Sequence, residues 1–208
     1  MPPKRTTACP ARWGKGAWMA IHQMTTAYPD RPTSKDKAMF RFVFKVLPKI
    51  LPCNVCARHF KDLLRTMPVE KHLGSRPDLM QWAHRAQAKS NKNVPDKKKE
   101  RPPELRRVLP TFAHKWQKGL RDYLFVTVMC LPSKHADLFA KWTRVMHRAL
   151  GDEAPVIKAA KRSDMLNQLC KFYKVGKTKV VRRYTPWLNV KKEQDTRSKV
   201  KQVLKSLL

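Results

Sequence analysis

The sequence predicts an all-α protein in which a four-helix bundle precedes a mainly helical, basic C-terminal region. Apolar residues recur every three to four positions in several separate segments, and this spacing is typical of one buried face of a helix. Proline residues and a Gly-Ser pair separate these segments at short intervals, as expected where one helix ends and another begins.

The first two predicted helices are separated by a proline-containing turn. Residues 14–28 carry apolar side chains at helical spacing around Trp18, and Pro29 ends this helix. Residues 33–50 open with a Ser/Asp-rich cap and carry a broad apolar face. This pattern predicts that the second helix is buried against the first.

Two further helices complete the predicted bundle. A short helix is expected at about residues 54–67, with a pair of cysteines at its entrance. Another is expected from residue 76 to about residue 91, after the break at Gly74-Ser75. Four helices within this length of chain predict a bundle with one shared core.

A charged segment divides the chain. Residues 92–104 hold four Lys, one Arg and three Pro in thirteen positions, a composition that predicts an exposed linker. We therefore expect a helical domain at residues 9–91, the linker at 92–104 and a basic helical region of unknown role at 105–208.

The C-terminal region contains three segments with a readable pattern. Residues 135–150 carry apolar side chains at helical spacing, and residues 196–208 form a basic amphipathic pattern that also predicts a helix. Residues 173–184 contain β-branched residues and Gly176, which predict a short β hairpin.

The charge of the chain predicts contact with polyanions. Among 208 residues, 46 are Lys or Arg and 15 are Asp or Glu, for a formal net charge of +31. Nucleic acid is the first candidate partner, because each neutralised phosphate releases counterions, and an anionic membrane or an acidic protein is the second. No apolar run has the length of a secretory signal or a membrane span, so we expect no membrane partner.

The stretch "LPCNVCARHF" at residues 51–60 places Cys53 and Cys56 two residues apart. A zinc site would need a second pair of ligands at similar spacing, and the sequence shows none, so we expect no metal. A thioredoxin-type site would follow a strand, whereas both flanks here predict helices. Two buried core cysteines are also compatible with this spacing, since free cysteine is among the most buried residue types. The spacing by itself does not decide between them.

The surroundings of the cysteine pair resemble a known family. Six landmarks occur in order: Cys9-Pro10, "GKGAW" at 14–18, "AIH" at 20–22, "YPDRPT" at 28–33, Pro52-Cys53-Asn-Val-Cys56, and Ser75-Arg76 before a helix with Trp82. In this order and at these intervals, residues 9–91 resemble the Erv/ALR family of FAD-linked sulfhydryl oxidases. The resemblance implies a helical bundle and an FAD cofactor.

The resemblance also implies a reaction and its two catalytic residues. A substrate dithiol would reduce a Cys53–Cys56 disulfide, and the electrons would pass to FAD and then to oxygen, yielding a protein disulfide and hydrogen peroxide. Cys53, expected further out, would meet the substrate thiol, and Cys56 would face the flavin. A cysteine pair at a helix N-terminus suits this chemistry, because backbone N–H groups and the helix dipole stabilise a thiolate.

Cofactor contacts follow from the same resemblance. The positions that it assigns to the flavin are Gly14, Lys15, Trp18, His22, Tyr28 and Asn91. From the residues alone, Trp18 and His22 could equally be core aromatics, and Lys15 could be a solvated charge. Cys9 could be a shuttle cysteine or an unpaired thiol.

One segment departs from the family pattern. Where the family carries His-Asn-x-Val-Asn, this chain has Gln87-Ala88-Lys89-Ser90-Asn91, so Asn91 alone matches. The loss of an imidazole and an amide predicts weaker FAD binding than in relatives.

These observations together predict an FAD-dependent thiol oxidase that acts on protein dithiols. The alternative is a non-catalytic protein that keeps the oxidase fold and binds nucleic acid or ribonucleoprotein through its basic surface. The resemblance leaves open a homodimer, and it suggests two homes: the virion or host cytoplasm for an enzyme of a large DNA virus, or the mitochondrial intermembrane space.

Overall fold

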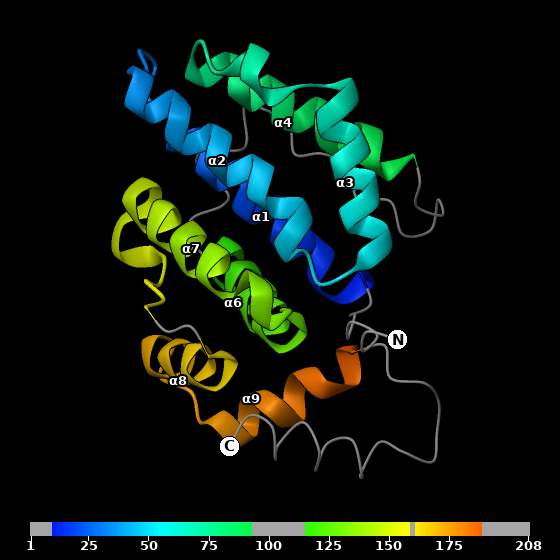
Figure 1. The fold of residues 1–208 in the computed structure, drawn as a ribbon, viewed down its shortest axis with the longest axis vertical. Helices are drawn as coiled ribbons and strands as arrows, with labels where there is room; N and C mark the ends of the chain where they lie inside the picture. The colour runs from blue at the N-terminus through cyan, green and yellow to red at the C-terminus, as the bar shows by residue number, and fades with distance from the viewer. Residues whose placement is uncertain (1–9, 93–114, 159–160, 189–208) are drawn as a thin grey trace.

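The computed structural model describes residues 10–92, 115–158 and 161–188. Within these ranges the elements are α-helices and short 3-10 helices, with no strand (Figure 1). The predicted all-α class is therefore confirmed. The predicted helix at 196–208 and nearly all of the predicted linker lie outside the described residues.

The four N-terminal helices agree closely with the sequence pattern. They are α1 (Pro10–Thr26), α2 (Ser34–Ile50), α3 (Asn54–Thr66) and α4 (Arg76–Asn91), with a 3-10 helix, η1 (Val69–His72), between the last two. The one sizeable difference is that α1 begins a turn earlier than predicted. Apolar spacing starts only at Trp13, which is buried, so the first turn of α1 carries no periodic signal.

Side-chain caps explain where these helices begin. The hydroxyl of Thr33 accepts a hydrogen bond of 3.2 Å from the backbone N–H of Asp36, and the Asp36 carboxylate accepts one of 2.9 Å from the Thr33 backbone. Hydrogen bonds from Thr33 also lower the pKa of Asp36. Ser75 caps α4, and the sulfur of Cys53 caps α3. Each cap satisfies an N–H group that lacks a partner within its helix.

Within the described ranges 115–158 and 161–188 the C-terminal part adds the α-helices α6 (Lys115–Cys130), α7 (Ala136–Leu150), α8 (Arg162–Phe172) and α9 (Lys177–Tyr184). The helix predicted at 135–150 is confirmed by α7. The hairpin predicted at 173–184 is wrong, because α9 occupies its second half. Val180, Val181 and Tyr184 are buried along one side of α9, so packing overrides their β propensity.

The two parts of the chain share a core. Helix α6 packs along α1, and α7 packs on α2 (Figure 1). The indole Nε1 of Trp142 in α7 donates a hydrogen bond of 3.2 Å to the backbone carbonyl of Val43 in α2. The buried apolar residues of both parts form one cluster. The division at residues 92–104 stays a prediction, but the regions on either side are in direct contact.

Two glycines allow α1 and α6 to cross closely. A Cβ atom on Gly16 would lie 2.7 Å from the carbonyl carbon of Gly119, and one on Gly119 would lie 2.9 Å from the Cα of Gly16. Real Cβ atoms do not approach backbone atoms this closely, so a side chain at either position would push the helices apart.

The described residues contain no helix of the length and apolar character needed to cross a membrane.

Candidate active site

The cysteine pair lies at the start of α3. Cys53 and Cys56 form a disulfide, with a Cα–Cα distance of 5.2 Å, which confirms the pairing that the resemblance implied. The backbone N–H of Cys56 also donates to the sulfur of Cys53 at 3.1 Å. Because the two sulfurs are bonded to each other, neither is available as a thiolate for zinc in this state.

The burial of the two cysteines corrects one expectation. Cys53 was expected further out, but it is 7% exposed, whereas Cys56 is half-buried. Cys53 takes the N-cap position, and its neighbours Leu51 and Pro52 are also buried, so the backbone that enters α3 is packed into the core. Between the cysteines, Val55 is 49% exposed. Solvent therefore reaches the disulfide from the side of Val55 and Cys56.

An aromatic cluster lies next to the disulfide helix. The ring of Trp18 in α1 is 6.2 Å from the ring of Phe60 in α3 and 6.4 Å from that of His22, between centroids. Phe60 follows Cys56 by four residues, so both project from the same face of α3. Trp18 is half-buried, whereas His22 and Phe60 are buried. We call Trp18, His22 and Phe60 the aromatic cluster.

His22 is held by a residue of α4. Its Nε2 lies 2.6 Å from the side-chain oxygen of Gln87, and both residues are buried. Desolvation lowers the pKa of His22, although the hydrogen bond to Gln87 acts in the opposite direction, and the nearby His84 lowers the pKa further. His22 is therefore a neutral imidazole at pH 7, with Nε2 protonated if it donates to Gln87.

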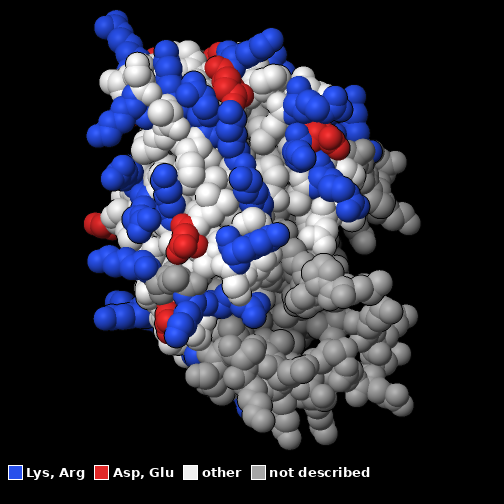
Figure 2. Space-filling view, in the orientation of Figure 1, with Lys and Arg blue, Asp and Glu red and all other residues white. Residues whose placement is uncertain are grey.

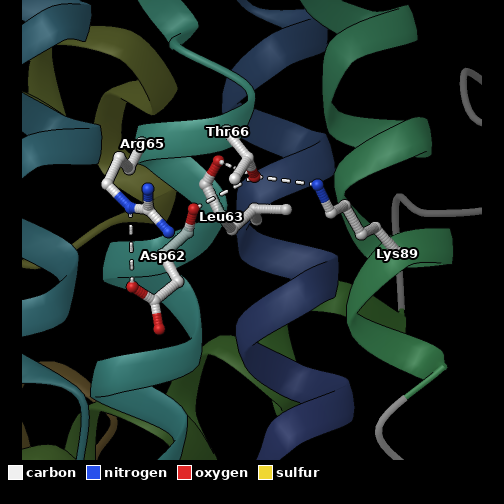
Figure 3. A network of polar contacts seen from close by, with 5 residues as sticks. All are labelled: Asp62, Leu63, Arg65, Thr66 and Lys89. Carbon is white, nitrogen blue, oxygen red and sulfur yellow. Dashed lines mark hydrogen bonds and ion pairs between the residues drawn. The ribbon is translucent and has the colours of Figure 1, made fainter.

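The other residues of the departing segment lie toward the end of α4. Ala88 is exposed, and Asn91 is half-buried at the last position of α4. The ammonium group of Lys89 donates a hydrogen bond of 2.8 Å to the hydroxyl of Thr66 at the end of α3 (Figure 3). Thr66 in turn donates to the carbonyl of Asp62 at 3.0 Å. These contacts fasten the end of α4 to the end of α3.

Tyr28 occupies a different part of the core. Its hydroxyl donates a hydrogen bond of 3.0 Å to the carbonyl of Leu73, and its ring packs edge-on against Phe40. Burial raises the pKa of Tyr28 to about 12. Arg76, at the start of α4, donates to the backbone carbonyl of Tyr28 at 2.6 Å. Gln87, which contacts His22, follows Arg76 by eleven residues on α4, or about 16 Å along the helix. Tyr28, which contacts Arg76, therefore lies well apart from His22.

Two other predicted cofactor contacts lie on α1. Gly14 is half-buried, and a Cβ atom there would meet no other atom within 4 Å, so packing does not require glycine at this position. Lys15 is exposed. The structure thus brings Trp18 and His22 together beside the disulfide helix, places Gly14 and Lys15 one turn earlier on α1, and separates Tyr28 from them.

The sequence analysis missed two residues of this site. Phe60 repeats the face of Cys56 at helical spacing, which could have identified it. The sequence analysis interpreted Gln87 only as the loss of the family's histidine. Its contact with His22 joins two different helices, and such a contact leaves no local signal in the sequence.

A Cys-x-x-Cys disulfide at a helix N-terminus, next to aromatic side chains in a helical bundle, defines a thiol–disulfide redox class of site. Residues 15–117, about half of the chain, match the Erv1 / Alr family, and this part of the chain belongs to that family.

Several curated relatives are similar to part of the chain. The FAD-linked sulfhydryl oxidase ERV1 of Oryza sativa subsp. japonica is 33% identical over 69 residues, which are 33% of this chain and 34% of the relative. The mitochondrial FAD-linked sulfhydryl oxidase ERV1 of Saccharomyces cerevisiae is 30% identical over 81 residues, 39% of this chain and 42% of the relative. The probable FAD-linked sulfhydryl oxidase R368 of Acanthamoeba polyphaga mimivirus is 32% identical over 74 residues, 35% of this chain and 52% of the relative.

The chain spans about a third of the length of the plant relatives that it matches. No solved structure matches the chain.

Proposed function

We propose that this protein is an FAD-dependent thiol oxidase that forms disulfides in protein substrates. The observation that carries the proposal is the Cys53–Cys56 disulfide at the start of α3, on the helix that also supplies Phe60 to the aromatic cluster. Its curated relatives, from plants, yeast and a virus, are named FAD-linked sulfhydryl oxidases.

The disulfide performs the first half of the reaction. A substrate thiolate attacks one sulfur of the disulfide and releases the other as a thiolate, and a second substrate thiolate then resolves the mixed disulfide. Cys53 and Cys56 are left as a dithiol, and the substrate gains a disulfide. The N–H of Cys56, which contacts the Cys53 sulfur at 3.1 Å, stabilises a thiolate on Cys53.

FAD, when bound, would supply a two-electron acceptor for the reduced cysteines and a donor to oxygen, so that overall two thiols and O2 would give one disulfide and H2O2. The donor set of the site fits this cofactor. Trp18 and Phe60 offer aromatic faces to a flat ring system, and neutral His22 can exchange hydrogen bonds with it. Lys15 adds a cation on α1 that suits a phosphate group.

The two sulfurs take different roles in this proposal. Cys56 shares a face with Phe60, which supports its assignment as the sulfur closer to the flavin. Cys53 stays the proposed target of the substrate thiol, as in the resemblance. Its low exposure means that the substrate must approach over Val55, whose exposed side chain offers an apolar contact to the incoming peptide.

Oxygen consumption tests the proposal. With dithiothreitol as substrate, the wild-type protein should consume oxygen and form hydrogen peroxide, and Cys56→Ser should abolish both while its helical circular dichroism stays near wild type. Cys170→Ala is the matched control, because Cys170 is a free, buried cysteine of α8. A Cys56→Ser protein with full activity would contradict the proposal.

A second function has support from the charge of +31. A non-catalytic protein that keeps the oxidase fold and binds nucleic acid would be colourless and would elute with RNA during purification.

A homodimer is a further proposal from the resemblance, and light scattering of the eluted protein measures it.

A further inference from the structure

Cations are abundant on the face of the protein that Figure 2 shows. Figure 2 shows Lys and Arg side chains across the face that carries α2, α3 and α7 in Figure 1, with few Asp or Glu among them. On α2, four basic residues recur every fourth position: Lys37, Arg41, Lys45 and Lys49. This spacing puts successive cations about 6 Å apart along one side of the helix.

Helix α7 carries a second basic row. Lys141, Arg144 and Arg148 are exposed and recur at helical spacing. The two helices lie side by side and run in opposite directions (Figure 1). We call the two rows together the basic ladder.

Two contacts fix the register between the rows. The ammonium group of Lys141 lies 4.9 Å from the ring centroid of Phe42, and Trp142 donates to the carbonyl of Val43. Arg41 is the neighbour of Phe42 on α2, and Arg144 follows Lys141 by one turn on α7, so both helices carry cations beside this contact.

At least three of the seven cations of the ladder lack an ion pair within the described residues. Lys45 forms an ion pair of 2.9 Å with Glu70. Burial raises the pKa of Glu70, but the hydrogen bond from Lys45 and the charges of Lys45 and Arg41 lower it overall. In the part of the chain that the structure describes, Lys37, Arg144 and Arg148 form no ion pair. Like charges held this close repel each other, and an anionic ligand would remove that repulsion.

We propose that the basic ladder binds the phosphate backbone of double-stranded nucleic acid, independently of base sequence. Packed helices lie about 8–10 Å apart, so the two rows can contact phosphates on both sides of a groove. Single strands bind through exposed aromatic side chains on which bases stack. Among the described residues, the exposed large apolar side chains are Val55 and Phe172, and neither lies on the ladder. The same lack of exposed apolar side chains disfavours a membrane surface, which takes up an apolar helix face.

The ladder is separate from the proposed oxidase site, because it contains none of the cysteines or aromatic residues of that site. It also changes where binding is expected. From the sequence, nucleic-acid binding is expected to map mostly to residues 92–208, whereas the α2 row of the ladder belongs to the family domain itself.

Fluorescence anisotropy with a short labelled DNA duplex of arbitrary sequence tests the ladder on the full-length protein. Arg41→Gln with Arg144→Gln should weaken binding at least about tenfold at about 0.1 M salt, and should make the dependence of log affinity on log salt shallower by about two. Thiol oxidation of dithiothreitol should stay at the wild-type rate, so a failure of the ladder and a failure of the oxidase proposal are distinguishable.

Lys171→Gln with Arg182→Gln is the control, since it removes the same charge from exposed positions on α8 and α9. This control should retain at least most of the wild-type affinity. Three results would overturn the proposal: equal loss in both variants, wild-type binding by the ladder variant, or tighter binding to a single strand or to anionic phospholipid vesicles than to the duplex.

Discussion

The imidazole of His22 and the side-chain amide of Gln87 form a buried hydrogen bond of 2.6 Å that joins α1 to α4. The family pattern has a histidine in place of Gln87, so this chain substitutes an amide at a position that supports a proposed flavin contact. The bond fixes the orientation of the His22 ring beside Trp18. The burial of His22 also couples its charge state to folding.

Acid should destabilise the protein through His22. Burial lowers the pKa of His22 in the folded state below its ordinary value of 6.5. Below pH 6.5 the unfolded chain therefore binds a proton that the folded protein does not, and the free energy of unfolding falls as the pH falls. The loss from this group approaches about 1.4 kcal/mol per pH unit until the folded state also protonates.

Urea unfolding of wild type and His22→Gln at about pH 7.5 and about pH 5.5 measures this effect. The variant should be less stable at the higher pH but should lose less stability on acidification. His59→Gln is the control, because His59 is exposed, and its pH response should match wild type. If His22→Gln and wild type lose the same stability, His22 is not the group responsible.

Restoring the family residues should strengthen FAD binding. Gln87→His with Ala88→Asn returns an imidazole and an amide, and Ala88 is exposed, so the asparagine needs no repacking. A hydrogen bond gained contributes roughly 0.5–1.5 kcal/mol. The ratio of flavin to protein absorbance after purification should rise, and added FAD should raise the melting temperature more than in wild type.

The contrary result for this double variant is informative. If flavin occupancy does not change, and FAD stabilises neither protein, the end of α4 does not face a flavin. The non-catalytic function would then be favoured.

Gly16 and Gly14 should respond oppositely to the same substitution. Gly16→Ala forces a Cβ atom against Gly119 and should destabilise the protein by about 1–3 kcal/mol, typical of overpacking. Gly14→Ala meets no atom within 4 Å and should stabilise α1 by about 0.5–1 kcal/mol, the ordinary helix preference for alanine. Thermal unfolding compares the two variants. A neutral Gly16→Ala would mean that α1 and α6 do not cross this closely.

The N-terminal helices should not fold well without the C-terminal region. A chain that ends at residue 104 lacks α6 and α7, which cover α1 and α2 and share their core. We expect this shorter chain to aggregate or to unfold without a cooperative transition. Full thiol oxidase activity and a sharp melting transition in the shorter chain would show instead that residues 9–91 are an independent domain.

Local signals in the sequence predicted most of the helices. Apolar spacing, the Ser/Asp-rich opening of residues 33–50 and the break at Gly74-Ser75 placed three of the first four helices to within a residue or so, because these signals are local. The same approach failed at residues 177–184, where valines that favour strands in isolation are buried on one side of α9. Burial against other helices determined the outcome there, and that is not encoded in the segment alone.

The site was predicted less completely than the fold. Resemblance identified the paired cysteines and the positions of Trp18 and His22. It did not identify the Gln87 contact or the relative burial of Cys53, because these depend on which helices meet. The close crossing at Gly16 has the same origin, since only the position of Gly119 on another helix makes that glycine necessary.

The absorption spectrum of the purified full-length protein tests the central claim most directly. The account predicts a yellow protein whose flavin band bleaches when dithiothreitol is added without oxygen and returns in air, whereas Cys56→Ser keeps the band but does not bleach at the wild-type rate. A colourless protein that takes up no added FAD would contradict the claim.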